Sequence, residues 1–177
     1  MMHIPKKPKA FLFDIDGTLT DSDPVHFKIF QELITKVPTI KNPSNEPIDH
    51  DFFRKYIAGG SNPIIFKNLY PDLSEKEHEK MWTEKEKEYR KRAITSLVRL
   101  NGLSEFMEQI DAKSIPKVAV TNAPRENAEM MLKALELDIW FKDLVVLGGE
   151  CEHAKPHPQP YIDGMRLLGL DPIEDAK

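Results

Sequence analysis

The sequence has 177 residues, of which 40% are hydrophobic and 31% charged, with a formal net charge of −4 at pH 7. This length allows one hydrophobic core, or a core with a small inserted unit, and the negative charge argues against nucleic acid and anionic membranes as partners. The single cysteine, Cys151, excludes an internal disulfide, and no apolar stretch has the length of a signal peptide core or a membrane span, so the cytoplasm is the expected location.

The first predicted strand, residues 10–13, is a short apolar run that ends at two aspartates, Asp14 and Asp16. Its composition is typical of a buried parallel strand, and ligands of open α/β sheets bind at the carboxyl ends of such strands. Strand alternation would direct both carboxylates to one side, where their repulsion favours a cation between them. Gly17 would allow the backbone to approach a ligand closely. We therefore expect chemistry at this point.

Residues 21–98 predict consecutive helices and no strand. Proline residues or polar caps mark the helix starts, near Pro24, Asp49, Pro63 and Ser74. The last helix opens with a capping box at residues 74–77 and is predicted to reach about Val98, with the charge run at residues 84–88 on a solvated face. A helical stretch in this place predicts an all-helical insert within an α/β domain formed by residues 1–20 and 99–177.

From residue 100 onward, predicted helices and strands alternate, which favours a parallel sheet. Two more buried strands are predicted, at residues 117–122 and 144–147. The first of these ends at Thr121 and Asn122, just before a helix, where a hydroxyl and free backbone N–H groups can hold phosphate. The loop after the other strand leads to Lys155, a cation that can balance a carboxylate and a phosphate.

These side chains supply most of what phosphoryl transfer to an aspartate requires. We assign Asp14 as the nucleophile and Asp16 as the general acid and base, because Asp16 lies just beyond the strand. Lys155 is the third catalytic residue. The expected phosphate-holding residues are Gly17, Thr18, Thr121 and Asn122.

The segment Asp14-Ile15-Asp16-Gly17-Thr18 resembles the first motif of the haloacid dehalogenase superfamily in its phosphatase form. Thr121-Asn122 is similar to the second motif, and Lys155-Pro156 to the third. The resemblance covers nearly the whole chain and implies a three-layer, Rossmann-like α/β core with a mobile helical cap. It also implies phosphate ester substrates and Mg²⁺ at Asp14 and Asp16. Within the superfamily, the helical insert is similar to that of sugar-phosphate phosphatases and β-phosphoglucomutase-like enzymes.

In that subgroup the cap largely selects the substrate, which makes two cap features candidates for substrate binding. The turn at Gly59-Gly60 matches a loop that often approaches the active site, although an ordinary helix stop is the alternative. His26 could touch substrate from the first cap helix, although such a histidine can also simply pack. His153 and His157 flank Lys155, but their spacing suits no common zinc pattern.

One part of the family pattern is missing from the sequence. The fourth motif is an acidic pair that closes a further strand, whereas Glu174 and Asp175 follow no apolar strand and predict a polar turn. The sheet is therefore expected to be incomplete at its C-terminal strands. Mg²⁺ would then be weakly held and activity low, and the exposed edge of the first strand would favour self-association.

The function predicted is a Mg²⁺-dependent phosphatase of small phosphate esters, above all phosphosugars, acting through an aspartyl-phosphate intermediate. A phosphosugar mutase is the near alternative, and a weakly active or inactive relic that acts by binding or self-association is the alternative from another class. A dehalogenase is disfavoured, because a halide leaving group needs no proton from Asp16. A receiver domain is disfavoured by the helical insert.

Overall fold

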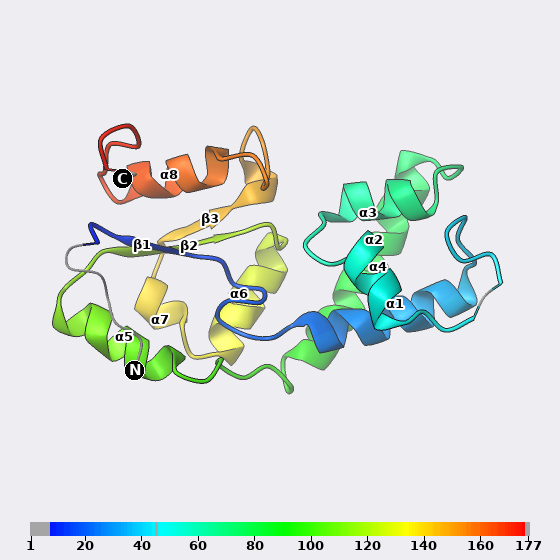
Figure 1. Ribbon diagram of the computed structural model, residues 1–177, viewed down its shortest axis with the longest axis horizontal. Helices are drawn as coiled ribbons and strands as arrows, with labels where there is room; N and C mark the ends of the chain where they lie inside the picture. The colour runs from blue at the N-terminus through cyan, green and yellow to red at the C-terminus, as the bar shows by residue number, and fades with distance from the viewer. Residues whose placement is uncertain (1–7, 45, 176–177) are drawn as a thin grey trace. The chain divides into compact units, whose positions relative to one another are not determined.

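The computed structural model describes residues 8–44 and 46–175, and the chain forms two compact units (Figure 1). The α/β unit contains residues 8–21 and 97–175, and the helical unit contains residues 22–96 with the one gap. The basic start of the chain, residues 1–7, lies outside the described residues. No helix in the described ranges is long and apolar enough to cross a membrane.

The α/β unit is built on a three-stranded parallel sheet in the order β1-β2-β3. The strands are β1 (Phe11–Phe13), β2 (Lys117–Thr121) and β3 (Val145–Leu147). Val118, Ala119 and Val120 of the central strand are fully buried, as expected when both faces of a parallel sheet are covered. All three predicted strands are confirmed, and so is the α/β fold class.

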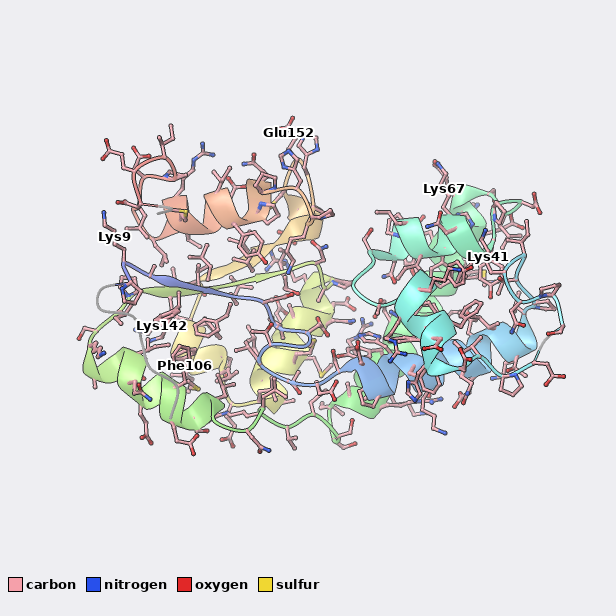
Figure 2. The ribbon with its side chains drawn as sticks, in the orientation of Figure 1. Lys9, Lys41, Lys67, Phe106, Lys142 and Glu152 are labelled. Carbon is pink, nitrogen blue, oxygen red and sulfur yellow. The ribbon has the colours of Figure 1, made fainter. Side chains whose placement is uncertain are left out.

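Helices cover both faces of this sheet (Figure 1). The face that carries α8 (Gln159–Leu167) packs closely through Gly164, where an added Cβ would lie 3.2 Å from Val120 and 3.3 Å from Leu12. The opposite face carries three helices, which are α5 (Leu103–Ala112), α6 (Arg125–Ala134) and α7 (Asp138–Phe141). There the ring of Phe13 lies 6.2 Å from that of Phe106, which Figure 2 labels. The result is the expected three-layer arrangement.

The helical unit consists of four helices packed around one apolar cluster. They are α1 (Asp23–Lys36), α2 (His50–Tyr56), α3 (Asn62–Leu69) and α4 (Glu75–Ala93). Phe30, Phe53 and Phe66 are among the buried members of the cluster. The predicted caps form, because Asp49 accepts a hydrogen bond from the Phe52 amide and residues 74–77 make a capping box. Each predicted helix start is confirmed to within two residues.

The predicted end of the last helix is wrong, because α4 stops at Ala93 rather than near Val98. Residues 98–100 instead pair with the segment that follows the first strand. The Thr20 hydroxyl donates to the Val98 carbonyl at 2.7 Å, and the Leu100 amide donates to the Leu19 carbonyl at 3.0 Å. Local sequence favoured a longer helix, but these hydrogen bonds to distant residues end it.

The charge run of α4 also departs from its predicted solvated face, because Lys85 and Glu86 are buried. Their side chains form an ion pair in which Lys85 Nζ lies 2.7 Å from Glu86 Oε1. The amide of Asn62 donates to the same oxygen at 2.7 Å. Burial is tolerated because the two charges compensate each other and the carboxylate gains a further hydrogen bond.

Two features bear on the remaining expectations for the sheet. The turn predicted at Glu174 and Asp175 is confirmed, with the Asp175 amide bonded to the Asp171 carbonyl at 2.8 Å. β1 lies at one end of the strand order, so within the described residues no strand pairs with its outer edge. Self-association through this edge stays a prediction, which sedimentation velocity at several concentrations would test.

Candidate active site

The turn after β1 carries two of the predicted catalytic residues. Asp14 directly follows the strand, and its Oδ1 accepts a hydrogen bond from the Ile15 amide at 2.8 Å. The chain then reverses, with the Gly17 amide bonded to the Thr20 carbonyl at 2.8 Å and Gly17 at a φ of +72°. A glycine suits this conformation because other residues rarely adopt it. The turn leaves Asp16 half-buried, with Gly17 and Thr18 exposed.

Lys155 reaches from the loop after β3 to the end of β1. Its Nζ lies 2.7 Å from Asp14 Oδ1 and donates to the Val120 carbonyl of β2 at 3.0 Å. The lysine side chain is 13% exposed and that of Asp14 is 35% exposed, so water reaches the carboxylate more readily than the ammonium group. The structure thus brings the predicted nucleophile and the predicted catalytic cation together. It also places Tyr161, which no sequence pattern indicates, with its ring centre 5.7 Å from Lys155 Nζ.

The end of β2 contributes Thr121 and Asn122. Thr121 is almost fully buried, and its Oγ1 accepts a hydrogen bond from the Ala123 amide at 3.0 Å. The side-chain amide of Asn122 makes two hydrogen bonds to the main chain of Lys155. Its Nδ2 donates to the Lys155 carbonyl at 3.0 Å, and its Oδ1 accepts from the Lys155 amide at 3.1 Å. Asn122 therefore joins the end of β2 to the loop that carries the lysine.

Cys151 lies in this same loop, between β3 and Lys155. Burial raises the pKa of its thiol, and the nearby Asp163 carboxylate raises it further. A thiol with a raised pKa is a poor nucleophile and a poor metal ligand near neutral pH, because both roles need the thiolate. Cys151 is therefore not a candidate for the chemistry of the site.

The remaining predicted substrate-binding residues belong to the helical unit. The ring of His26 on α1 stacks on that of Tyr89 on α4, with 4.1 Å between their centres and 2° between their planes. Gly59 lies in the turn between α2 and α3 with a φ of +72°, and a Cβ on Gly60 would come within 2.8 Å of Ile65. The three residues thus have packing or turn roles inside their own unit, and their contact with substrate stays a prediction.

The oxygen ligands of the turn fit a magnesium ion. Mg²⁺ is usually held by one or two carboxylates, with phosphate oxygens and water completing its shell. The turn offers the Asp14 carboxylate, which is partly open to solvent, and the main-chain carbonyl of Asp16. Over residues 8–44 and 46–175, no three His, Cys, Asp or Glu side chains gather in an arrangement that could hold a metal.

The chain is similar in sequence to known phosphatases and in fold to a solved enzyme structure. A family model of haloacid dehalogenase-like hydrolases matches residues 8–175. The phosphorylated carbohydrates phosphatase of Thermotoga maritima is 26% identical over 175 residues, which are 96% of this chain and 77% of that protein. Pyrophosphatase PpaX of Bacillus cereus is 29% identical over 174 residues, 95% of this chain and 72% of that protein. The crystal structure of β-phosphoglucomutase from Clostridium difficile matches with a TM-score of 0.76 and 26% identity, covering 94% of this chain and 73% of that one.

Proposed function

The chain belongs to the haloacid dehalogenase-like hydrolase family, and from this premise we propose that it is a Mg²⁺-dependent phosphatase of small phosphate esters, above all phosphosugars. The observation that carries the proposal is the 2.7 Å ion pair between Asp14 and Lys155 at the carboxyl ends of the parallel strands. A carboxylate nucleophile beside a fixed cation suits attack on phosphorus, because the cation offsets repulsion between two anions.

In the proposed reaction, Asp14 attacks the phosphorus atom and the bond to the ester oxygen breaks. Asp16 donates a proton to the leaving oxygen, so the alcohol departs neutral. Asp16 then takes a proton from the water that hydrolyses the aspartyl phosphate, which returns both carboxylates to their starting states. Lys155 stabilises negative charge on the phosphoryl oxygens, and Thr121 with nearby main-chain amides would hold those oxygens.

Magnesium would be held by the Asp14 carboxylate and the Asp16 carbonyl. When bound, the ion neutralises charge on the phosphate and the carboxylate and so favours their approach. The partly exposed Asp14 carboxylate supports this assignment, since the ion can keep several waters as further ligands.

The substrate class is inferred from the relatives. The likeness to a phosphorylated carbohydrates phosphatase favours phosphosugars, and the likeness to PpaX makes pyrophosphate the compound to compare with them. We assign selection of the leaving group to the helical unit, with His26, Gly59 and Gly60 as the residues to test first.

The test is phosphate release by the purified chain from a panel of phosphosugars and pyrophosphate, with Mg²⁺ and with excess EDTA. Asp14→Asn is expected to reduce release on the order of 10⁴-fold, because the nucleophile is lost. Asp51→Asn is the matched control, since Asp51 lies on α2 with a side chain that is 81% exposed. Release that persists in Asp14→Asn, or that EDTA leaves unchanged, would contradict the proposal.

A phosphosugar mutase is the second candidate, favoured by the likeness to β-phosphoglucomutase. A mutase returns the phosphoryl group to a different hydroxyl of the sugar, whereas a phosphatase gives it to water. Product analysis separates the two, because a mutase yields an isomeric phosphosugar and little free phosphate. If neither product forms above the level of Asp14→Asn, the alternative of a binding protein without catalysis gains support.

A further inference from the structure

Lys155 is held at both of its ends. Its ammonium group is fixed by Asp14 Oδ1 and by the Val120 carbonyl. Its main chain is fixed by two hydrogen bonds with the side chain of Asn122. The Asn122 amide donates to the Lys155 carbonyl, and the Asn122 oxygen accepts from the Lys155 main-chain N–H. A long flexible side chain whose Cα and charged end are both fixed has lost most of its freedom before any substrate binds.

Gly148, the first residue after β3, makes room for this arrangement. A Cβ at Gly148 would lie 2.2 Å from Asn122 Oδ1, a distance that no methyl group can keep from an oxygen. The φ of Gly148 lies outside the left-handed region, so the close approach and not the backbone conformation calls for glycine here. At the next residue, Gly149, an added Cβ would meet nothing within 4 Å. The two neighbouring glycines therefore differ in whether they face Asn122.

We propose that Asn122 is a positioning residue for catalysis, which sets the place from which Lys155 reaches Asp14, and that Gly148 is required because it leaves space for the Asn122 side chain. The proposal rests on the proposed function, in which Lys155 acts on the phosphoryl group. Both hydrogen bonds go to the main chain at 155, so Asn122 fixes the backbone and leaves the ammonium group to act. A displacement of about 1 Å at a reacting group can cost on the order of 10²-fold in rate.

The first experiment uses thermal unfolding and needs no activity. Gly148→Ala is expected to lower the Tm in the wild-type background, because its methyl group strikes Asn122 Oδ1. In the Asn122→Ala background the same substitution is expected to have a much smaller effect, since that oxygen is gone. Gly149→Ala is the matched control and should leave the Tm unchanged in both backgrounds. An equal loss from Gly148→Ala in both backgrounds would overturn the packing part of the proposal.

The second experiment measures kcat and KM. Asn122→Ala is expected to lower kcat by about 10–100-fold with KM changed less than about threefold, as for other residues that orient a catalytic group. In a Lys155→Met background, Asn122→Ala should cause no further loss, because the group that it positions is absent. A residue that only supports the fold would lower activity by the same factor in both backgrounds.

The outcomes separate this proposal from the proposed function. A wild-type chain without phosphatase activity on any ester refutes the proposed function, and the catalytic part of this inference falls with it. An active wild type whose Asn122→Ala variant keeps its kcat refutes the inference alone. An Asn122→Ala loss that is just as large in the Lys155→Met background also refutes it.

Discussion

Each of the two units contains a lysine paired with a carboxylate at 2.7 Å. In the α/β unit, Lys155 pairs with Asp14, whose side chain is 35% exposed. In the helical unit, Lys85 pairs with Glu86, whose side chain is only 7% exposed and which also accepts the amide of Asn62. The first pair can meet a ligand from solution, whereas the second is enclosed by its own unit. The same two functional groups thus form a pair that solvent reaches in one place and an enclosed pair in the other.

The two tryptophans allow this difference to be measured, because each unit contains one. Trp82 packs against the apolar cluster of the helical unit, and the indole of Trp140 bonds to Asp111 in the α/β unit. With Trp140 replaced by Phe, fluorescence follows unfolding of the helical unit, and with Trp82 replaced by Phe, it follows the α/β unit.

The largest effect is expected from Lys155→Met. Loss of this cation should lower kcat by about 10²–10³-fold, since a fixed charge no longer stabilises the phosphoryl oxygens. The unfolding midpoint read from Trp140 should change little, because the Asp14 partner is partly solvated. Lys133→Met, on the exposed side of α6, is the control in the same unit. A Lys155→Met variant that keeps most of the activity would show that the open pair is not catalytic.

Glu86→Ala is expected to act in the opposite way, on stability. It removes the carboxylate that balances the charge of the buried Lys85 ammonium, which should destabilise the helical unit by about 3–5 kcal/mol. Denaturant unfolding read from Trp82 measures this loss, and Glu84→Ala on the exposed face of α4 is the control. Replacing the pair together, as Lys85→Met with Glu86→Leu, should restore much of the stability. If Glu86→Ala leaves the free energy of unfolding unchanged, the buried pair does not stabilise the helical unit.

A smaller effect is expected at the start of α4. The Ser74 side chain accepts the Glu77 amide, and the Glu77 carboxylate accepts the Ser74 amide in return. Ser74→Ala removes half of this capping box and should cost the helical unit about 1 kcal/mol. The Trp82 signal should register that loss while the Trp140 signal stays unchanged. Equal shifts at both tryptophans would mean that the two units unfold together.

The smallest effect is a pH dependence in the α/β unit. The hydrogen bond from Lys117 lowers the pKa of Asp111, and that from Trp140 adds to the effect. A lowered pKa means that the stabilisation is fully present above the ordinary aspartate pKa of 3.8 and is lost as the pH falls through the pKa of the folded protein. Because Asp111 is half exposed, the contribution should be only a few tenths of a kcal/mol. Unfolding followed at Trp140 between pH 5 and pH 3 should show it in the wild type and not in Asp111→Asn.

The sequence predicted the elements that depend on local signals and missed those that depend on distant partners. The apolar run before Asp14 and the capping box at Ser74 are local, and both led to correct elements. The end of α4 depends on the pairing of Val98 with Thr20, far away in the chain. A four-residue helix such as α7 is too short to show the apolar repeat of a helix, so the sequence does not predict it.

The same distinction applies to the site. The sequence predicts the meeting of Asp14 with Lys155, because parallel strands bring their carboxyl ends to one edge and the motifs follow in order. The contact between Asn122 and Gly148 joins two loops and leaves no pattern in the chain beyond a glycine after a strand. The burial of Lys85 and Glu86 was missed for a similar reason, since their neighbours on α4 are charged and exposed.

The pairing of residues 19–20 with residues 98–100 has a consequence for the modularity of the chain. Leu19, Thr20, Val98 and Leu100 are joined by hydrogen bonds within the α/β unit, so the two points at which residues 22–96 leave and rejoin it are neighbours. The entropy cost of closing an insert between two fixed ends rises only slowly with its length, by about 0.6 kcal/mol for each doubling. Arg99 secures the return segment further by donating to the Leu135 and Glu136 carbonyls at the end of α6. The hydrogen bonds that hold these two linker segments together thus belong to the α/β unit itself and do not depend on contacts made by residues 22–96.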